Sequence, residues 1–370
     1  MTQRERFLAT MRYQPVDHVP DCEFGYWDDT FKRWHHEGLP EEINSNSNCD
    51  PFFGFERKMN VPSAIGLHPG FESKVVEDKE GHQIIQDSEG VLKVVHTDGT
   101  DSIPRYLRFP IEGRDDWEQF KERLDPDDPV RYRDDWEEIA QATRESDVPV
   151  QIGCGSLFGR VRNWMGFEGV SLMCYDDPEL LEEIIEHLCN LICTVLEPAV
   201  EHCQLDVGAF WEDMNFRQGC IISPEMFHRW LTPRYKRITD LIRKAGAEFC
   251  YVDSDGNILD VVQGWHDGGV NIMFPVEVAA GSDPFEIRRR WGEAGRMMGG
   301  VNKRPLALGR EAIDEELRAL KPMVDEGGFI PHVDHRVPPD VGYEDYLYYL
   351  RRKRELFGIP EPTDAPMFNA

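Results

Sequence analysis

Short hydrophobic runs alternate with longer amphipathic stretches along most of this chain, most clearly after about residue 115. The runs are typical of buried strands, because they are short, end in glycine or polar residues and are followed by helix-length segments. They span residues 18–26, 148–154, 205–212, 248–255, 270–276, 296–302 and 328–334. Helices are predicted between them over residues 178–203, 224–245 and 310–326. This order predicts βα units around a parallel sheet.

The region 75–108 has a different pattern. Its short alternating apolar segments are separated by Glu80-Gly81, Glu89-Gly90 and Asp98-Gly99, which are dipeptides typical of hairpin turns. We therefore predict a small antiparallel meander inserted into the larger fold.

The predicted fold class is α/β, a (β/α)8 TIM-type barrel with the meander as an insertion near residues 75–108. Seven visible strands, with an eighth hidden in a loop-rich segment, suit this barrel better than a doubly wound sheet. A dinucleotide-binding sheet would carry a GxGxxG motif after its first strand, and the chain has none. No internal repeat, low-complexity tract or flexible linker divides the sequence, so we predict one domain over residues 1–370.

Composition narrows the function classes. The chain carries 41 Lys and Arg against 69 Asp and Glu, a formal net charge of −28, so its surface repels nucleic acid and anionic lipid. No stretch approaches the ~20 apolar residues that span a bilayer, and the start is too polar for a signal peptide. We therefore expect a cytoplasmic protein that binds neither nucleic acid nor membrane. The 9 cysteines include no CxxC pair, which argues against a disulfide scaffold and a zinc ribbon.

Polar side chains follow five of the predicted strands where each strand ends. In a barrel of this type the reactive groups come from the carboxyl ends of the strands, because those ends meet at one face of the fold. The candidates are Glu212, Asp253, Asp255, Glu277, Lys303, His332 and His335. The chain contains no GxSxG, HExxH or P-loop motif, so serine hydrolase, metalloprotease and nucleotide triphosphatase mechanisms have no support.

Asp253 and Asp255 are the central pair of this set. Their spacing in a strand places both carboxylates on the same side of the chain, directly before Gly256. Two such carboxylates can share a proton or bind a cation, and imidazole and ammonium groups from other strand ends can complete the site. With a histidine they suit magnesium, manganese or zinc. Acid–base chemistry and substrate hydrogen bonding are the alternatives to a metal.

The chain resembles proteins of the uroporphyrinogen decarboxylase-like family over nearly its whole length. The motifs that carry the resemblance are RERFLATMRYQPVDHVP at the start, 25–40, 109–126, 164–184, 210–238, VDSDGNI at 252–258, FPVEVAAGSD at 274–283, GGVNKRPLA at 299–307 and 328–350. The resemblance implies a (β/α)8 barrel. The family holds both porphyrinogen decarboxylases and methyltransferases that move methyl groups to or from corrinoid proteins, so the fold does not choose between the two activities.

Departures from the family patterns favour methyl transfer. The decarboxylases carry an RQAGRY-type segment whose arginines bind substrate carboxylates, whereas this chain has DCEFGYWDDTFKRW at that place. The methyltransferases carry a His-x-Cys pair and a second Cys that hold zinc. On this chain those positions are Asp253, Asp255 and a place near His335. Such ligands make a harder, more Lewis-acidic ion than thiolates do, which suits activation of an oxygen rather than a thiol.

The sequence therefore predicts a methyltransferase that moves a methyl group between a small O-methylated substrate and a corrinoid protein. Asp253, Asp255 and His335 would hold a divalent metal or act as the acid. Their neighbours would be Glu212, Glu277 and His332, with Lys303 as a charge clamp. Corrinoid would enter only through the partner protein, and a homodimer fits the family. The alternatives are a decarboxylase of a porphyrinogen or smaller carboxylated substrate, and a non-catalytic subunit that docks a corrinoid protein.

Overall fold

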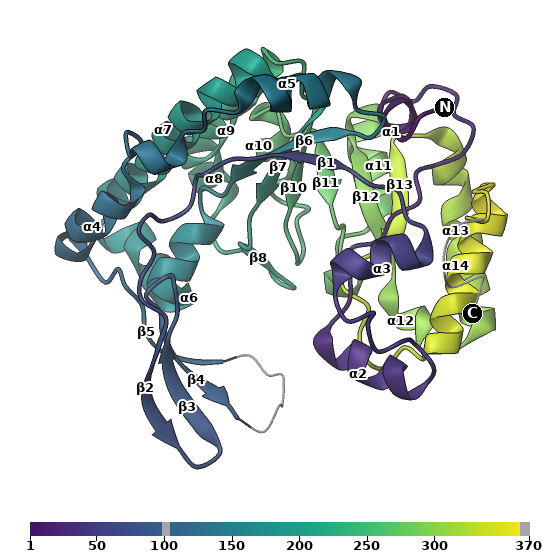
Figure 1. Ribbon diagram of the computed structural model, residues 1–370, viewed down its shortest axis with the longest axis horizontal. Coiled ribbons are helices and arrows are strands. Elements are labelled where there is room, and N and C mark those ends of the chain that lie inside the picture. The colour runs from purple at the N-terminus through teal and green to yellow at the C-terminus, as the bar shows by residue number, and fades with distance from the viewer. Residues whose placement is uncertain (98–103, 363–370) are drawn as a thin grey trace.

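Seven parallel strands form the central sheet in this computed structural model, which describes residues 1–97 and 104–362 (Figure 1). Their order is β1, β6, β7, β10, β11, β12 and β13, and every neighbouring pair is parallel. The strands are β1 (Met59–Val61), β6 (Val150–Gly155), β7 (Val207–Trp211), β10 (Phe249–Asp253), β11 (Ile272–Phe274), β12 (Arg296–Val301) and β13 (Phe329–Val333). The fold is thus of the predicted TIM-type α/β class, and β1 is the strand that the loop-rich segment concealed. The described strands that pair in this sheet number seven, whereas eight were predicted, because the segment 18–26 forms no ladder.

The predicted strand over 18–26 is wrong as a ladder strand. Among the described residues, its only bridge pairs Tyr26 with Val337, although backbone hydrogen bonds join the segment to both edges of the sheet. The Glu56 amide donates to the Asp21 carbonyl beside β1, and the Val337 amide donates to the Gly25 carbonyl beyond β13. The physical reason lies in Glu23, whose side chain accepts from the backbone amide of Val333 and so takes the donor that a ladder would use.

Buried ion pairs hold this segment in place. Lys353 donates to the Glu23 carboxylate at 2.6 Å and pairs with Asp21 at 2.8 Å, and Arg354 donates to Asp21 at 2.7 Å. Tyr349 also donates to Glu23 at 2.8 Å. The basic residues lie on the last helix, so the ends of the chain are tied together next to the two edge strands.

Helices surround the sheet and confirm most of the predicted ones. The helix over 310–326 is observed with those bounds, and that over 178–203 ends one residue earlier. The helix predicted over 224–245 is divided after Trp230, because Pro233 has no amide hydrogen and fixes a new first turn. The helices are α1 (Gln3–Met11), α2 (Asp28–His36), α3 (Asn46–Phe53), α4 (Arg114–Phe120), α5 (Trp136–Glu145), α6 (Gly159–Asp176), α7 (Pro178–His202), α8 (Pro224–Trp230), α9 (Thr232–Arg243), α10 (Val262–Asp267), α11 (Pro284–Trp291), α12 (Lys303–Leu306), α13 (Arg310–Glu326) and α14 (Tyr343–Phe357).

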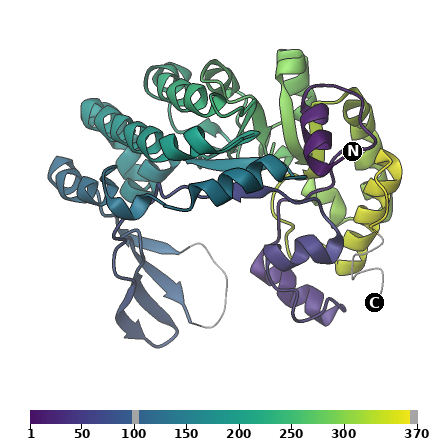
Figure 2. The same ribbon diagram turned by 45° about the horizontal axis from the view of Figure 1, so that its top comes forward.

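The predicted meander is confirmed as a four-stranded antiparallel sheet. Its strands are β2 (Lys74–Lys79), β3 (His82–Gln86), β4 (Leu92–His96) and β5 (Arg105–Arg108), in that spatial order. Turns fall at Glu80-Gly81 and Glu89-Gly90 as expected, and Asp98-Gly99 lies outside the described residues. A short hairpin, β8 (Asn215–Phe216) with β9 (Gly219–Cys220), follows β7. Figure 2 shows the meander standing apart from α2 and α3.

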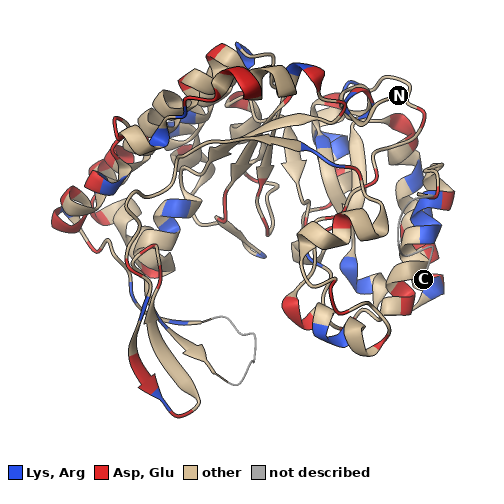
Figure 3. Cartoon of the chain, in the orientation of Figure 1, with Lys and Arg blue, Asp and Glu red and all other residues tan. Residues whose placement is uncertain are grey.

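The two faces of the central strands differ in burial. In β6, Val150, Ile152 and Cys154 are buried, whereas the alternate residue Gln151 is half-buried. On this second face Tyr251 donates to Gln151 at 3.2 Å, and Gln151 donates to Asn60 at 2.9 Å. Charged residues lie mainly on the helices, loops and meander (Figure 3). The sheet therefore packs one face against the helices and presents a partly exposed polar face at its centre.

The remaining sequence expectations concern cysteines and membranes. All nine cysteines are free thiols, and six of them are buried. No helix in the described part of the chain is long and apolar enough to cross a bilayer. The prediction of a single domain over residues 1–370 and of a cytoplasmic location stay predictions.

Candidate active site

The Asp253-Ser254-Asp255 segment lies at the carboxyl end of β10. Asp253 is the last residue of the strand and pairs in register with Trp211 of β7 and Phe274 of β11. Ser254 is buried between them, because its amide donates to the Phe274 carbonyl and its hydroxyl accepts from Asn215. This buried serine directs the two carboxylates away from the core on the same side, as the alternation predicts.

Gly256 ends the segment and must be glycine. Its φ is +83°, and a Cβ there would lie 2.6 Å from the backbone of Asn215. Its amide donates to the Glu277 carboxylate at 3.0 Å. The turn that presents Asp255 is therefore fixed on both sides.

Asp255 and His335 meet as predicted. The Asp255 Oδ2 and His335 Nε2 atoms are 3.2 Å apart, and the side chains are 38% and 13% exposed. The His335 ring stacks on Trp27 with centroids 5.4 Å apart and meets the edge of Phe24 at 5.5 Å. The second carboxylate oxygen of Asp255, Oδ1, is buried and has no hydrogen-bond partner among the described residues. This oxygen is an acceptor that a substrate or a proton can use.

Asp253 has the most unusual carboxyl group of the site. Burial, and next the negative charge of Asp255, raise the pKa of Asp253 to about 7, although His335, Lys58 and Arg336 oppose the shift. Near neutral pH, Asp253 therefore exists in comparable amounts as acid and base. A carboxyl group with such a pKa is suited to proton transfer.

The predicted metal site does not fit this arrangement. Among residues 1–97 and 104–362, no group of three or more His, Cys, Asp or Glu side chains is placed so as to hold a metal ion. The structure joins Asp255 to His335, but Asp253 is not a third converging ligand. The bound metal therefore stays a prediction.

Glu212 lies next to β10, but its side chain serves the start of α6. Its carboxylate accepts from the amides of Leu157, Phe158 and Gly159 and from the hydroxyls of Ser156 and Tyr235, at 2.6 to 3.0 Å. Glu212 is fully buried, and burial raises its pKa. No hydrogen bond joins its side chain to either aspartate among the described residues. These five hydrogen bonds give the Glu212 side chain a structural role, because they hold the start of α6.

Glu277 and Lys303 form an ion pair of 2.7 Å between Oε1 and Nζ. The second oxygen of Glu277 holds the Gly256 amide. The Lys303 amide donates to Asp334 at 2.9 Å, and Asp334 also accepts from the Ala279 amide. These contacts tie together the loops that follow β10, β11, β12 and β13, so they set the geometry of the site from its rim.

His332 is buried on β13 and contacts the ring of Phe274 at 5.3 Å between centroids. Its Nδ1 lies 2.8 Å from the Val333 carbonyl, so Nδ1 carries the hydrogen and donates. Nε2 then holds a lone pair, and it has no partner among the described residues. Burial lowers the pKa of His332 to about 3, which keeps the ring neutral.

Sequence patterns missed several residues of this group. The charges of Lys58 and Arg336 act on Asp253. Trp27 stacks on the His335 ring, and Lys58 lies over the ring of Tyr251. The sequence pattern did not indicate Lys58, because the strand that follows it has only three residues. Arg336 follows His335 directly and could have been found from that position.

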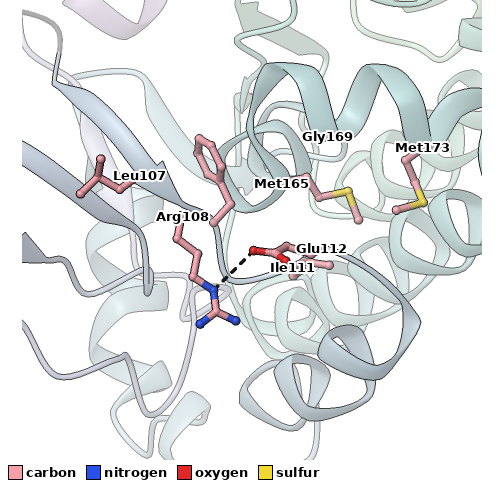
Figure 4. A pocket seen from close by; sticks show the side chains of 8 residues that line it. Leu107, Arg108, Ile111, Glu112, Met165, Gly169 and Met173 are labelled. Atoms are coloured by element: carbon pink, nitrogen blue, oxygen red, sulfur yellow. Dashed lines mark ion pairs between the residues drawn. The ribbon is translucent and has the colours of Figure 1, made fainter.

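A cavity of about 220 Å³ lies elsewhere, at the root of the meander (Figure 4). It lies between β5 and α6, and Arg108 and Glu112 form an ion pair of 3.4 Å at its side. None of the predicted site residues lines it. Its lining is Leu107, Arg108, Phe109, Ile111, Glu112, Met165, Gly169 and Met173.

Comparison with known proteins identifies the family. The sequence profile of the family described as uroporphyrinogen decarboxylase (URO-D) matches residues 94–353, which is more than half of the chain. The chain belongs to the uroporphyrinogen decarboxylase family. The match confirms the resemblance and contains Asp253, Asp255 and His335. Trp27 and Lys58 lie before the matched residues, so part of the site comes from outside the match.

A solved structure shares the fold of this uroporphyrinogen decarboxylase family member. It is a methyltransferase from Methanosarcina mazei, with 17% sequence identity and a TM-score of 0.61. The similarity covers 96% of this chain and 99% of the other. At this identity the likeness establishes the fold. No curated protein matches the chain in sequence.

Proposed function

We propose that the protein is a methyltransferase that removes a methyl group from a small O-methylated substrate and passes it to a corrinoid on a partner protein. The observation that carries the proposal is the Asp253 carboxyl group, with its pKa of about 7, beside the Asp255–His335 pair. The fold that the chain shares with a methyltransferase also supports methyl transfer.

Breaking a methyl ether bond needs a proton on the departing oxygen. The protonated carboxyl of Asp253 donates this proton while the O–CH₃ bond breaks, and the bonding electrons stay with the oxygen, which leaves as an alcohol. A corrinoid would supply the nucleophile that accepts the methyl group. Asp255 keeps the proton on Asp253 by electrostatic repulsion, and His335 holds Asp255 in place.

Nε2 of the neutral His332 and Oδ1 of Asp255 are two acceptors without a partner among the described residues. A substrate hydroxyl or amide can donate to either atom, which would orient the ether oxygen. Glu277 and Lys303 act on the site indirectly, because they hold the turn at Gly256 rather than reach outward.

The test is methyl transfer to chemically reduced cob(I)alamin from a panel of small methyl ethers, followed by the absorbance of methylcobalamin. Replacing the acid in Asp253→Asn should lower the rate by about 100-fold or more. Asp134→Asn is the matched control, because Asp134 is exposed and has no side-chain hydrogen bond among the described residues. An Asp253→Asn variant with the original rate would overturn the proposal.

The alternatives give different results in the same assay. A carboxy-lyase would release CO₂ from a carboxylated substrate without forming methylcobalamin. A docking subunit would show no turnover that depends on Asp253 or Asp255. In particular, Asp255→Ala would leave a verified turnover intact if the barrel only binds a corrinoid protein.

A further inference from the structure

A row of three uncharged polar side chains crosses the partly exposed face of the central sheet. The Tyr251 hydroxyl on β10 donates to Oε1 of Gln151 on β6 at 3.2 Å. Nε2 of Gln151 in turn donates to Oδ1 of Asn60 on β1 at 2.9 Å. The oxygen of each carboxamide therefore accepts from the residue before it, and the row ends in the Nδ2 group of Asn60, which has two hydrogens to donate.

The Asn60 amide is the open end of this row. Asn60 is exposed, and in the part of the chain that the structure describes its Nδ2 group has no hydrogen-bond partner. Gln151 and Tyr251 are half-buried and use their hydrogen bonds within the row. The N–H groups of Asn60 are therefore available to an oxygen atom from outside the chain.

The strand register explains how Tyr251 reaches Gln151. Tyr251 pairs with Ala209 of β7, and Ala209 pairs with Gly153 of β6. Both of these residues are small, so the phenol ring can extend across β7 to the strand beyond it. The Lys58 Nζ lies over the face of the same ring, 5.7 Å from its centroid, and is not a member of the row.

The row is an unusual use of the inner face of this fold. In a TIM-type barrel, bulky apolar side chains normally fill that face. A carboxamide placed there costs free energy unless its N–H groups find acceptors. For Asn60 the acceptor has to be water or a ligand, since the row itself offers none. The row is therefore suited to bind the oxygen of a ligand.

The row lies next to the proposed acid. Tyr251 and Asp253 are two residues apart on β10, so their side chains leave the strand on the same side. Asp253 is the last residue of the strand, and Tyr251 lies further from its carboxyl end. A substrate whose ether oxygen lies at Asp253 can thus extend along this face toward the row.

We propose that Asn60, oriented by Gln151 and Tyr251, binds a neutral oxygen on the body of the substrate, so that the methyl donor is an ether that also carries a carbonyl or hydroxyl group. This inference rests on the proposed function, since it assigns the substrate class of the same site. Asn60 donates to that oxygen directly, whereas Tyr251 is a positioning residue that acts through Gln151.

Binding measurements test this inference separately from catalysis. Calorimetry would compare two methoxyphenyl ketones with the hydrocarbons in which CH₂ replaces the carbonyl. The pairs are 4-methoxyacetophenone with 4-ethylanisole, and 4-(4-methoxyphenyl)butan-2-one with 4-butylanisole, so that two reaches are covered. We expect at least one ketone to bind about five-fold or more tightly than its hydrocarbon, as one neutral hydrogen bond provides. No preference in either pair would overturn the inference.

Variants test the residues of the row. Asn60→Leu has a similar shape and no N–H donor, so it should abolish the preference for the ketone and leave the affinity for the hydrocarbon unchanged. Tyr251→Phe should reduce the same preference, because Gln151 then loses the donor that orients it. Asn44→Leu is the matched control, because Asn44 is exposed and has no side-chain hydrogen bond among the described residues.

The outcomes separate this inference from the proposed function. A ketone preference that persists in Asn60→Leu would overturn the inference, even if methyl transfer is found. Equal weakening of ketone and hydrocarbon in Asn60→Leu would also overturn it, because the residue would then have only a structural role. An unchanged preference in Tyr251→Phe would overturn the positioning role of Tyr251. If the preference depends on Asn60 and no methyl transfer occurs, only the proposed function fails.

Discussion

Asp255 and His335 lie 80 residues apart in the sequence and meet through a contact of 3.2 Å between Oδ2 and Nε2. One follows β10 and the other follows β13, so the parallel order of the strands brings them to the same end of the barrel. This contact fixes the carboxylate whose charge, with burial, raises the pKa of Asp253. The pair is therefore the structural basis of the proposed acid.

The role of Glu212 can be tested through stability. Glu212→Gln keeps one acceptor oxygen and replaces the other with an amide NH₂ group that cannot accept. At least two of the five donors, which come from residues 156–159 at the start of α6 and from Tyr235 of α9, therefore lose their acceptor. We expect the free energy of unfolding to fall by about 2 kcal/mol or more, measured by urea denaturation. Glu138→Gln, at an exposed position of α5, is the control. Unchanged stability with lost turnover would instead support the catalytic role predicted from the sequence.

His332 should make stability depend on pH. The pKa of His332 is about 3 in the folded chain and ~6.5 when unfolded, so the unfolded state gains a proton first as pH falls. Its contribution is present above pH ~6.5 and is lost progressively toward pH 3. Between pH 7 and 5, His332→Gln should lose about 2 kcal/mol less stability than the original chain. Equal losses in both, with the exposed His36→Gln as reference, would contradict the assignment.

The acid mechanism predicts the result of metal removal. Because the aspartates and His335 do not converge as three ligands, we expect dialysis against a chelator to leave methyl transfer within about two-fold of its initial rate, a change smaller than general acid catalysis provides. Elemental analysis of protein purified without chelators is the companion measurement. Loss of turnover that returns with zinc, manganese or magnesium would show that the predicted metal site forms.

Strand periodicity predicted the barrel well where one face is buried. The run at 248–255 places Val252 and Ser254 in the core and leaves both aspartates on the partly exposed side. The same pattern failed at 18–26, because Glu23 occupies a backbone donor that only the folded chain brings to it. No local pattern reveals a side chain that replaces a ladder hydrogen bond.

The candidate site could be predicted only in part, because the sequence shows which residues follow a strand but not where their side chains point. Asp253, Asp255 and His335 could be predicted because each follows a strand, and the fold brings the carboxyl ends of its parallel strands together. Position after a strand could not separate Glu212, which has the same position but turns toward buried amides. Nor could it find Lys58, whose charge acts on Asp253 only because the three-residue strand β1 joins the same sheet.

The central claim is that Asp253 carries a proton near neutral pH, and titration of its carboxyl carbon by ¹³C NMR measures this directly. Asp253→Asn identifies the signal. We predict a pKa of about 7 in the original chain and a lower pKa in Asp255→Asn, since that variant removes a repelling charge. A pKa near the ordinary aspartate value of ~4, unchanged in Asp255→Asn, would contradict the account.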